Sequence, residues 1–185
     1  YLVQLSSREL TAKDSSEISK LLHTIGDLER IGDHAVNLLE AAREKKDKGL
    51  RFSEQARGEL KVLSSAIVDI LDLTVRAFAE NSIELARQVE PLEQVVDVLK
   101  SELKDRHIQR LKKGTCTIEM GFILSDLLTN FERVSDHCSN IAVCLIQIAE
   151  SQFETHGYLN GLKHSDQSQF AAAFEKNLEK YALPE

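Results

Sequence analysis

The sequence predicts an all-helical fold, because glycine and proline are rare, apolar residues recur at helical spacing, and capping residues separate long segments. Only two Pro and eight Gly occur among 185 residues, so few positions force a helix to end. Hydrophobic residues make up 42% and charged residues 29% of the chain, which is typical of a folded domain with its own core. No low-complexity linker divides the chain, and we therefore interpret residues 1–185 as a single domain.

The first two expected helices have clear starting signals. Asp14 and Glu17 form a predicted capping box, and the helix that they open continues to about Lys46. Residues 1–13 are interpreted as the remnant of an upstream helix. Ser53 is expected to cap the second helix, whose apolar residues follow helical spacing up to the break at Asn81.

The next two helices complete the core of the domain. Ser82 is predicted to cap a third helix that ends at Gly114, and Pro91 is expected to kink this helix about two turns after its start. Thr115 is expected to cap the fourth helix, which reaches about Gln152.

A short amphipathic helix is expected at the end of the chain. Residues 14–152 form the predicted core, and residues 154–163 are interpreted as a loop because they contain Gly157 and Gly161. Ser165 then caps the short helix, which covers residues 165–181.

Composition and charge exclude several classes of function. A net charge of −7 argues against nucleic acid as a partner, because binding a phosphate backbone needs a basic surface. No apolar run approaches the roughly 18–20 residues that a membrane-spanning helix requires. The three cysteines form no CxxC pair, so a zinc ribbon is excluded and reduced thiols are expected.

A twelve-residue repeat links the first and fourth expected helices. Residues 27–38, DLERIGDHAVNL, align with residues 130–141, NFERVSDHCSNI. The five identical positions are all polar, namely Glu, Arg, Asp, His and Asn, whereas the apolar positions change conservatively. Conservation of a core alone would keep apolar character and let polar residues change, so the repeat indicates shared chemistry in a duplicated helical unit.

The repeat carries acidic pairs spaced four residues apart, which places both carboxylates on one face of a helix. A third pair lies on the third helix, and an asparagine continues the row in the first and fourth. The residues are Glu29, Asp33 and Asn37; Glu132, Asp136 and Asn140; and Glu93 and Asp97. A single such pair usually lies on a solvated face, so only a feature shared by all three pairs would indicate a site.

All three pairs border the apolar stripe of their helix on the same side. The stripes expected to be buried are Leu21, Leu22, Ile25, Val36 and Leu39; Leu85, Val89, Leu92, Val96 and Leu103; and Leu124, Leu128, Phe131, Ala142 and Ile146. Paired carboxylates beside a core repel each other and lose solvation, which is costly unless a cation or arginines from other helices offset it. Ligation by oxygen alone suits Mg²⁺, Mn²⁺ or Fe³⁺, and Zn²⁺ tolerates it. His34 and His137 point away from the acidic row, so a capping or surface role is favoured over ligation.

The doubled ERIGD and ERVSD motifs, each in the middle of a long helix, resemble the hallmark of the PhoU family. The resemblance implies an antiparallel bundle of helices with metal clusters on the acidic faces, and a role in phosphate uptake or its control. It implies that the six acids at 29, 33, 93, 97, 132 and 136 are metal ligands, with Asn37 and Asn140 beside them. Ser135 departs from the usual glycine of the motif.

The first unit of the resemblance is incomplete. We expect four long helices, comprising one whole three-helix unit and the last helix of a preceding unit, followed by the short C-terminal helix. The ending EKYALPE looks like that of bacterial sodium/phosphate cotransporters, in which such a region follows the membrane domain. This implies a non-enzymatic regulatory domain at the cytoplasmic face, covalently linked to a transporter, with Fe, Zn, Mn or Mg bound and phosphate sensed through the metal.

Two alternatives remain at this stage. A stand-alone PhoU-type regulator would instead have an ABC transporter and a histidine kinase as partners. A carboxylate-bridged metalloenzyme is disfavoured, because no ExxH pair accompanies the carboxylates. A further expectation concerns the first helix, whose apolar stripe needs covering: left bare, it would cause the domain to self-associate into a homo-oligomer.

Overall fold

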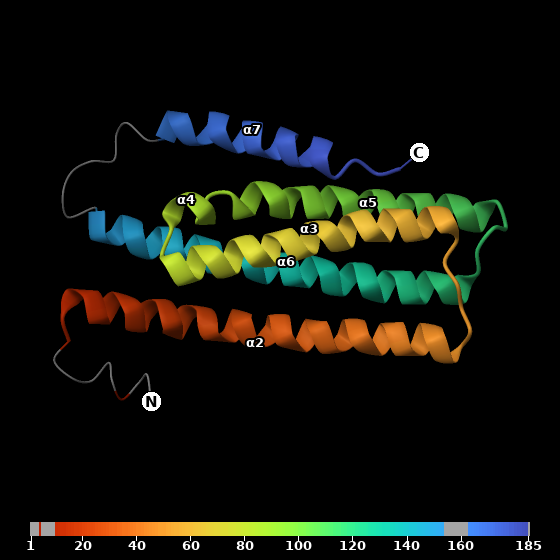
Figure 1. Cartoon of the computed structure of the whole chain (residues 1–185), viewed down its shortest axis with the longest axis horizontal. Coiled ribbons are helices and arrows are strands. Elements are labelled where there is room, and N and C mark those ends of the chain that lie inside the picture. Colours follow the sequence, from red (N-terminus) through yellow and green to blue (C-terminus); the bar gives the residue numbers. More distant parts are fainter. Residues whose placement is uncertain (1–3, 5–9, 154–162, 185) are drawn as a thin grey trace.

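The computed structural model describes residue 4 and residues 10–153 and 163–184, and this part of the chain is helical (Figure 1). The elements are α2 (Ala12–Asp47), α3 (Glu54–Glu80), α4 (Ile83–Ala86), α5 (Val89–Lys112), α6 (Ile118–Phe153) and α7 (Lys163–Lys180). The prediction of an all-helical bundle with four long helices and a short C-terminal one is confirmed. Of the predicted helix remnant at 1–13, residues 1–3 and 5–9 lie outside the described residues, Thr11 is the N-cap of α2, and Ala12 and Lys13 belong to α2. The predicted loop at 154–163 lies outside the described residues except for Lys163, which belongs to α7.

Helix α6 is the centre of the bundle. It contacts α2, α3, α4 and α5, while α3 and α5 also pack on each other and α7 lies along α5 (Figure 1). The main core lies where α3, α5 and α6 meet, and its fully buried side chains include Leu63, Ile70, Val89, Val95, Val96 and Ile141. Most of the predicted stripe residues of the third and fourth helices are buried there. The predicted three-helix unit is therefore α3, α5 and α6, with α2 added against α6.

A buried ion pair and hydrogen bonds from the end of the chain join the helices of this unit. Glu59 on α3 is 1% exposed, and Arg110 binds both of its carboxylate oxygens at 2.9 Å. After α7, the hydroxyl of Tyr181 donates to Asp69 on α3 at 2.5 Å, and Lys180 donates to the same carboxylate at 2.7 Å. A paired carboxylate can stay ionised in a core, so these contacts fix α5 and the C-terminus onto α3.

Two of the predicted N-caps are wrong: the cap of α2 by three residues and the cap of α6 by two. Thr11 caps α2, where its hydroxyl accepts from the backbone N–H of Asp14, so no capping box forms with Glu17. Thr117 caps α6 in the same manner through Met120, instead of Thr115. The cap of α2 lies upstream of the predicted residue and that of α6 lies downstream, and each shift is less than one helical turn, because neighbouring threonine and aspartate residues offer similar capping groups. The predicted caps at Ser53 and Ser82 and the stop at Gly114 are confirmed.

Pro91 ends one helix instead of kinking a longer one. The third predicted helix is split into α4 and α5, and Pro91 lies in the first turn of α5. A proline has no N–H to donate to the carbonyl four residues earlier, and its ring crowds that carbonyl at Arg87. The chain therefore stops at Arg87, the C-cap of α4, and starts again where a missing N–H costs nothing.

The orientation of α2 contradicts the predicted burial of its apolar stripe. Leu21, Leu22, Ile25, Val36 and Leu39 are all exposed, between 36% and 57%. Ile18, Thr24 and Ala41 are buried instead, and Ile31 packs against the main core. Hydrophobic periodicity locates an apolar face, but it does not decide which face a neighbouring helix covers when specific polar contacts compete. No helix in the described part of the chain is both long and apolar enough to cross a membrane.

Candidate functional site

The two repeated motifs meet at the interface between α2 and α6. Asp27 of α2 accepts from His137 Nδ1 of α6 at 2.8 Å and from the side-chain amide of Asn140 at 3.3 Å, both through its Oδ1. His137 is 7% exposed, so its bond to Asp27 lies inside the interface. The motif of α6 thus donates two hydrogen bonds to the first residue of the motif of α2.

The same contacts occur a second time with the helices exchanged. Asn130, the first residue of the α6 motif, lies 2.8 Å from His34 Nδ1 and accepts from the side-chain amide of Asn37 at 3.1 Å. Because the Asn130 oxygen already accepts from Asn37, His34 must donate to it through Nδ1–H. The two imidazole rings stack, with centroids 5.6 Å apart and planes 25° apart. The motifs therefore pair antiparallel about a local pseudo-twofold axis.

We refer to this arrangement as the polar clasp. Its members are Asp27, His34, Asn37, Asn130, His137 and Asn140. The clasp explains why histidine and asparagine are identical in the two motifs, because each motif must both donate to and accept from the other. The histidines, expected to cap helices or lie on the surface, instead join two helices. The structure likewise places Asn37 and Asn140 in the clasp.

The acidic residues of α5 and α6 gather on the other side of α6. Burial, together with the smaller effects of the negative charges of Asp97, Glu90, Asp136 and Glu132, raises the pKa of Glu93 to about 7. Burial, together with the charges of Glu132 and Asp136, also raises the pKa of Asp97, against the opposing effect of Lys100. Four predicted site residues therefore lie close enough together on α5 and α6 to affect one another's charge. They are Glu93, Asp97, Glu132 and Asp136, and we call them the acidic cluster.

Some members of the acidic cluster have cationic or hydroxyl partners. Lys100 forms an ion pair with Glu132, and Arg133 lies 3.4 Å from Asp136 on the outer surface. Ser139 donates to Glu90. Sequence analysis missed both Glu90 and Lys100. Their spacing was the available signal, since Glu90 precedes Glu93 by three residues and Lys100 follows Asp97 by three, so all four lie on one side of α5.

The side chains of the acidic cluster do not converge as metal ligands in their present positions. Among the described residues, no three His, Cys, Asp or Glu side chains are arranged so that they could hold a metal ion. Within the same part of the chain, no hydrogen bond or ion pair compensates the carboxylate of Glu93, and burial and the neighbouring carboxylates disfavour its charged form. The cluster is therefore a place where added positive charge would be stabilising, with Lys100 supplying some of it.

The first predicted acidic pair lies apart from this cluster. Glu29 and Asp33 are exposed on the side of α2 that faces away from α6. They occupy in the α2 motif the positions that Glu132 and Asp136 occupy in the α6 motif. The difference is that α5 lies beside one pair, whereas in the described part of the chain α2 packs along α6 and meets the end of α3 only near Lys20, away from Glu29 and Asp33.

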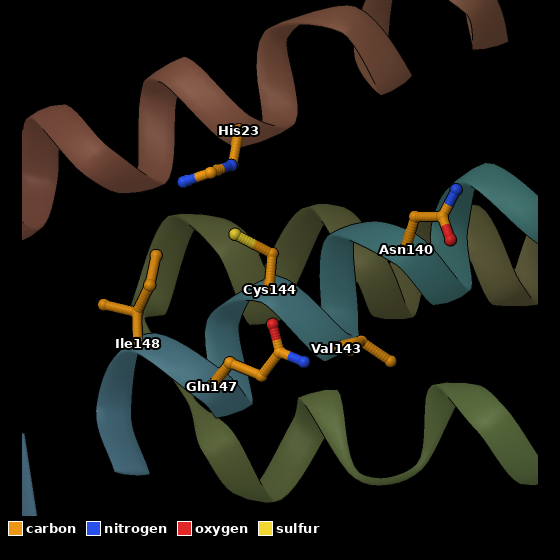
Figure 2. Close-up of a pocket in the computed structure, with 6 residues that line it drawn as sticks. All are labelled: His23, Asn140, Val143, Cys144, Gln147 and Ile148. Carbon is orange, nitrogen blue, oxygen red and sulfur yellow. The ribbon is translucent and has the colours of Figure 1, made fainter. Parts of the chain in front are cut away.

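An open pocket of about 440 Å³ adjoins the polar clasp between α2 and α6. Figure 2 shows His23 of α2 facing Cys144 and Gln147 of α6 across it. Burial, with the charge of Asp27 nearby, raises the pKa of Cys144, so its thiol stays protonated at neutral pH. Burial also raises the pKa of Cys138 to about 11, and this residue packs in the main core. Neither thiol is an activated nucleophile.

Comparisons with known proteins agree with the motif. The PhoU domain model matches residues 1–42 and 60–145, well over half of the chain. The phosphate-specific transport system accessory protein PhoU homolog 1 of Thermotoga maritima is 25% identical over 131 residues, which cover 71% of this chain and 56% of that protein. The phosphate-specific transport system accessory protein PhoU of Serratia marcescens is 24% identical over 159 residues, 82% of this chain and 61% of that protein. No solved structure matches the chain significantly.

The matched region covers only part of each relative's length. The chain spans little more than half of the Thermotoga and Serratia proteins. A PhoU homolog of Streptococcus pneumoniae is matched over 69% of its length at 26% identity. The similarity includes both motif helices, α2 and α6.

The polar clasp predicts a measurable coupling between its two helices. In a double-mutant cycle, Asp27→Ala and His137→Ala should couple by about 1 kcal/mol in the free energy of unfolding, because each removes the same partly buried hydrogen bond. The measurement is urea denaturation of the four proteins. As a control, Glu29→Ala and His137→Ala should be additive within about 0.5 kcal/mol. Equal coupling in both cycles would contradict the clasp.

The acidic cluster predicts a loss of stability as pH rises. The folded state keeps the proton of Glu93 up to about pH 7, whereas the unfolded state releases it near the ordinary value of 4.5. The folded state therefore binds more protons between these values, and the free energy of unfolding falls as pH rises through that window. Since Glu93 is half-exposed and screened by solvent, Glu93→Gln should raise stability at pH 8 by roughly 1 kcal/mol, with no gain at pH 4.

Urea denaturation at pH 4, 6 and 8 checks this expectation. Glu40→Gln, an exposed carboxylate on α2, serves as the control and should change stability little at every pH. A gain from Glu93→Gln that is the same at pH 4 and pH 8 would show that like-charge repulsion is not its cause.

Proposed function

The chain belongs to the PhoU domain family, and from this membership we propose that it is a non-enzymatic accessory module that controls phosphate transport. The observation that carries the proposal is the family match across both motif helices, α2 and α6. Relatives that are 24–25% identical to this chain are phosphate-specific transport system accessory proteins by name. The histidines and asparagines of the motif have a structural role in this proposal, because they join α2 to α6.

The transporter is the proposed partner, and the favoured arrangement is a covalent one. We propose that the chain is the cytoplasmic part of a sodium-dependent phosphate cotransporter, supported by the resemblance of its last seven residues to the ends of such proteins. The second candidate, a separate PhoU-type regulator, is favoured by the names of the relatives. The two differ in whether phosphate uptake controlled by this protein depends on sodium.

A metal ion is the proposed source of additional positive charge at the acidic cluster. The support is electrostatic: Glu93 and Asp97 both have raised pKa values because carboxylates of α5 and α6 are crowded together. Binding Fe, Zn, Mn or Mg there would require Glu132 to exchange Lys100 for the metal and the side chains to turn inward. A metal held in this way would also give an acidic protein a surface that attracts phosphate.

Thermal denaturation with and without Mn²⁺ tests the metal proposal. A ligand at about a hundred times its Kd adds about 2.7 kcal/mol of stability, which for a chain of this size raises Tm by about 5–10 °C. The double variant Glu132→Gln/Asp136→Asn should lose this rise. The matched control is Glu29→Gln/Asp33→Asn, which removes the equivalent pair on the exposed face of α2 and should keep the rise. If the α6 variant responds to Mn²⁺, Zn²⁺ and Fe as the parent does, the metal site is misplaced.

Phosphate uptake by cells tests the proposed function. Removing residues 10–184 from the parent gene should change phosphate uptake in phosphate-replete cells, and restoring them should reverse the change. Loss of the effect when sodium is replaced by choline would favour the cotransporter, whereas an effect that persists would favour the separate regulator. Uptake that is the same with and without these residues, in both media and at low and high phosphate, would contradict a role in phosphate transport.

A further inference from the structure

A pocket of about 260 Å³ lies at the end of the bundle where the α2–α3 and α5–α6 connections come together (Figure 1). Its lining comes from these two connections, the last turns of α5 and the first turns of α3 and α6. It is smaller than the pockets of about 300–1,000 Å³ that hold drug-sized ligands, so its size suits a small ion or metabolite. No residue of the acidic cluster lines it.

The lining of this pocket is basic and rich in hydroxyl groups. Arg51 and Arg110 line it together with Ser53, Thr115 and Thr117. None of the described residues that line it is acidic. In a chain whose net charge is −7, a pocket with two arginines and no carboxylate favours a negatively charged occupant by charge complementarity.

The positive charge around the pocket is only partly neutralised. Arg51 forms no hydrogen bond or ion pair with the described residues. Arg110 gives two of its five N–H donors to Glu59, and Arg106 binds the same carboxylate, so two positive charges face one negative charge. A guanidinium group stays protonated throughout the physiological pH range, so this excess charge is permanent.

The hydroxyls that cap two helices supply further donors. Ser53 and Thr117 each accept from a backbone N–H in the first turn of the helix that they cap, at 3.2 and 3.3 Å. Each hydroxyl uses a lone pair in its cap and keeps its O–H proton to donate to a ligand. The N-termini of α3 and α6 therefore open on one pocket, and both attract an anion through their N–H groups and dipoles. The first-turn acids Glu54 and Glu119 are exposed and do not line it.

A buried histidine also lines the pocket. His107 is 8% exposed, its Nδ1 lies 3.8 Å from the thiol of Cys116, and its Nε2 has no hydrogen-bond partner in the described part of the chain. Burial and the charge of Arg110 lower the pKa of His107, against the effect of Glu59, so the imidazole is neutral at neutral pH. The protein itself thus leaves polar groups around this pocket incompletely paired, as is expected where a ligand completes them.

We propose that this pocket binds inorganic phosphate through Arg51, Arg110 and the hydroxyls of Ser53 and Thr117. The arginines supply charge and the hydroxyls supply directed donors, so the site needs no metal ion. The geometry indicates a small oxyanion, and the choice of phosphate rests on the proposed function. A bound anion contacts the ends of α3, α5 and α6 together, so it also stabilises the bundle.

Isothermal titration calorimetry of the 185-residue chain with phosphate from about 0.01 to 10 mM, in EDTA, measures this binding. The expected result is one saturable site per chain. Thr117→Asp should weaken binding at least about tenfold, because aspartate keeps the helix cap but replaces a donor with a negative charge. Ser82→Asp makes the same change at the cap of α4, outside the pocket, and should leave binding unchanged. Circular dichroism checks folding, and Ser53→Asp replaces Thr117→Asp if helix content falls.

Arginine variants distinguish a specific site from general electrostatic attraction. Arg51→Gln should weaken binding about three- to tenfold, because it removes a charged donor of the pocket. Arg57→Gln removes an exposed charge that is paired with Glu54 outside the pocket, and it should change binding by less than about twofold. Equal weakening by both arginine variants, or by Thr117→Asp and Ser82→Asp, would overturn the proposal. Binding of glycerol 3-phosphate without binding of inorganic phosphate would also overturn it and assign the pocket to a phosphomonoester.

The phosphate site and the proposed function fail in different measurements. The absence of saturable phosphate binding, in a protein whose residues 10–184 still change phosphate uptake, would overturn the site alone. Saturable binding that Thr117→Asp abolishes would support the site even if removal of these residues left uptake unchanged, and that second result would contradict the proposed function.

Discussion

The antiparallel pairing of α2 with α6 through the polar clasp is the contact on which the arrangement of the functional surfaces depends. Asp27 and Asn130 each accept from a histidine and an asparagine of the opposite helix, so both the direction and the register of the pair are specified. A shift by one residue would break all four contacts and leave buried polar groups unpaired. Once this register is set, the acidic face of α6 meets α5 and the acidic face of α2 faces outward.

The buried carboxylates of the bundle fall into two electrostatic classes. Glu59 is almost completely buried, yet Arg106 and Arg110 surround it, so it serves as a structural tie between α3 and α5. Glu93 is less buried but faces other carboxylates, and its pKa is raised to about 7. Folding tolerates such an uncompensated group only at a cost in stability. This contrast is what marks the acidic cluster of α5 and α6 as a place for an added cation.

The two copies of the repeated motif lie in different surroundings, one largely buried on α6 and one largely exposed on α2. On α6 the apolar face lies under α3 and α5, and its carboxylates gain the partner Lys100. On α2 the corresponding apolar face is exposed in the described part of the chain, and Glu29 and Asp33 are exposed as well. The motif therefore supplies the same donors, acceptors and apolar stripe twice, and the helices that surround each copy decide how these are used.

Much of the fold follows from local sequence. Rare glycine and proline, the caps at Ser53 and Ser82 and the left-handed Gly114 define long helices, because capping and backbone strain act within a few residues. The spacing of Glu93, Asp97, Glu132 and Asp136 likewise located the residues that the structure brings together in the acidic cluster. These are short-range properties that a chain carries before it folds.

Other features were decided by contacts between residues far apart in the chain. The apolar stripe of α2 was expected inside, yet α2 turns toward α6 the face that carries Asp27, His34 and Ile31, because the hydrogen bonds of the clasp and the packing of Ile31 both lie on that face. Lys100 pairs with Glu132 only because α5 and α6 lie side by side. The sequence by itself determined which helices form and which faces are acidic or apolar. The tertiary structure decided which of those faces meet, since burial and hydrogen-bond complementarity depend on the pairing of whole helices.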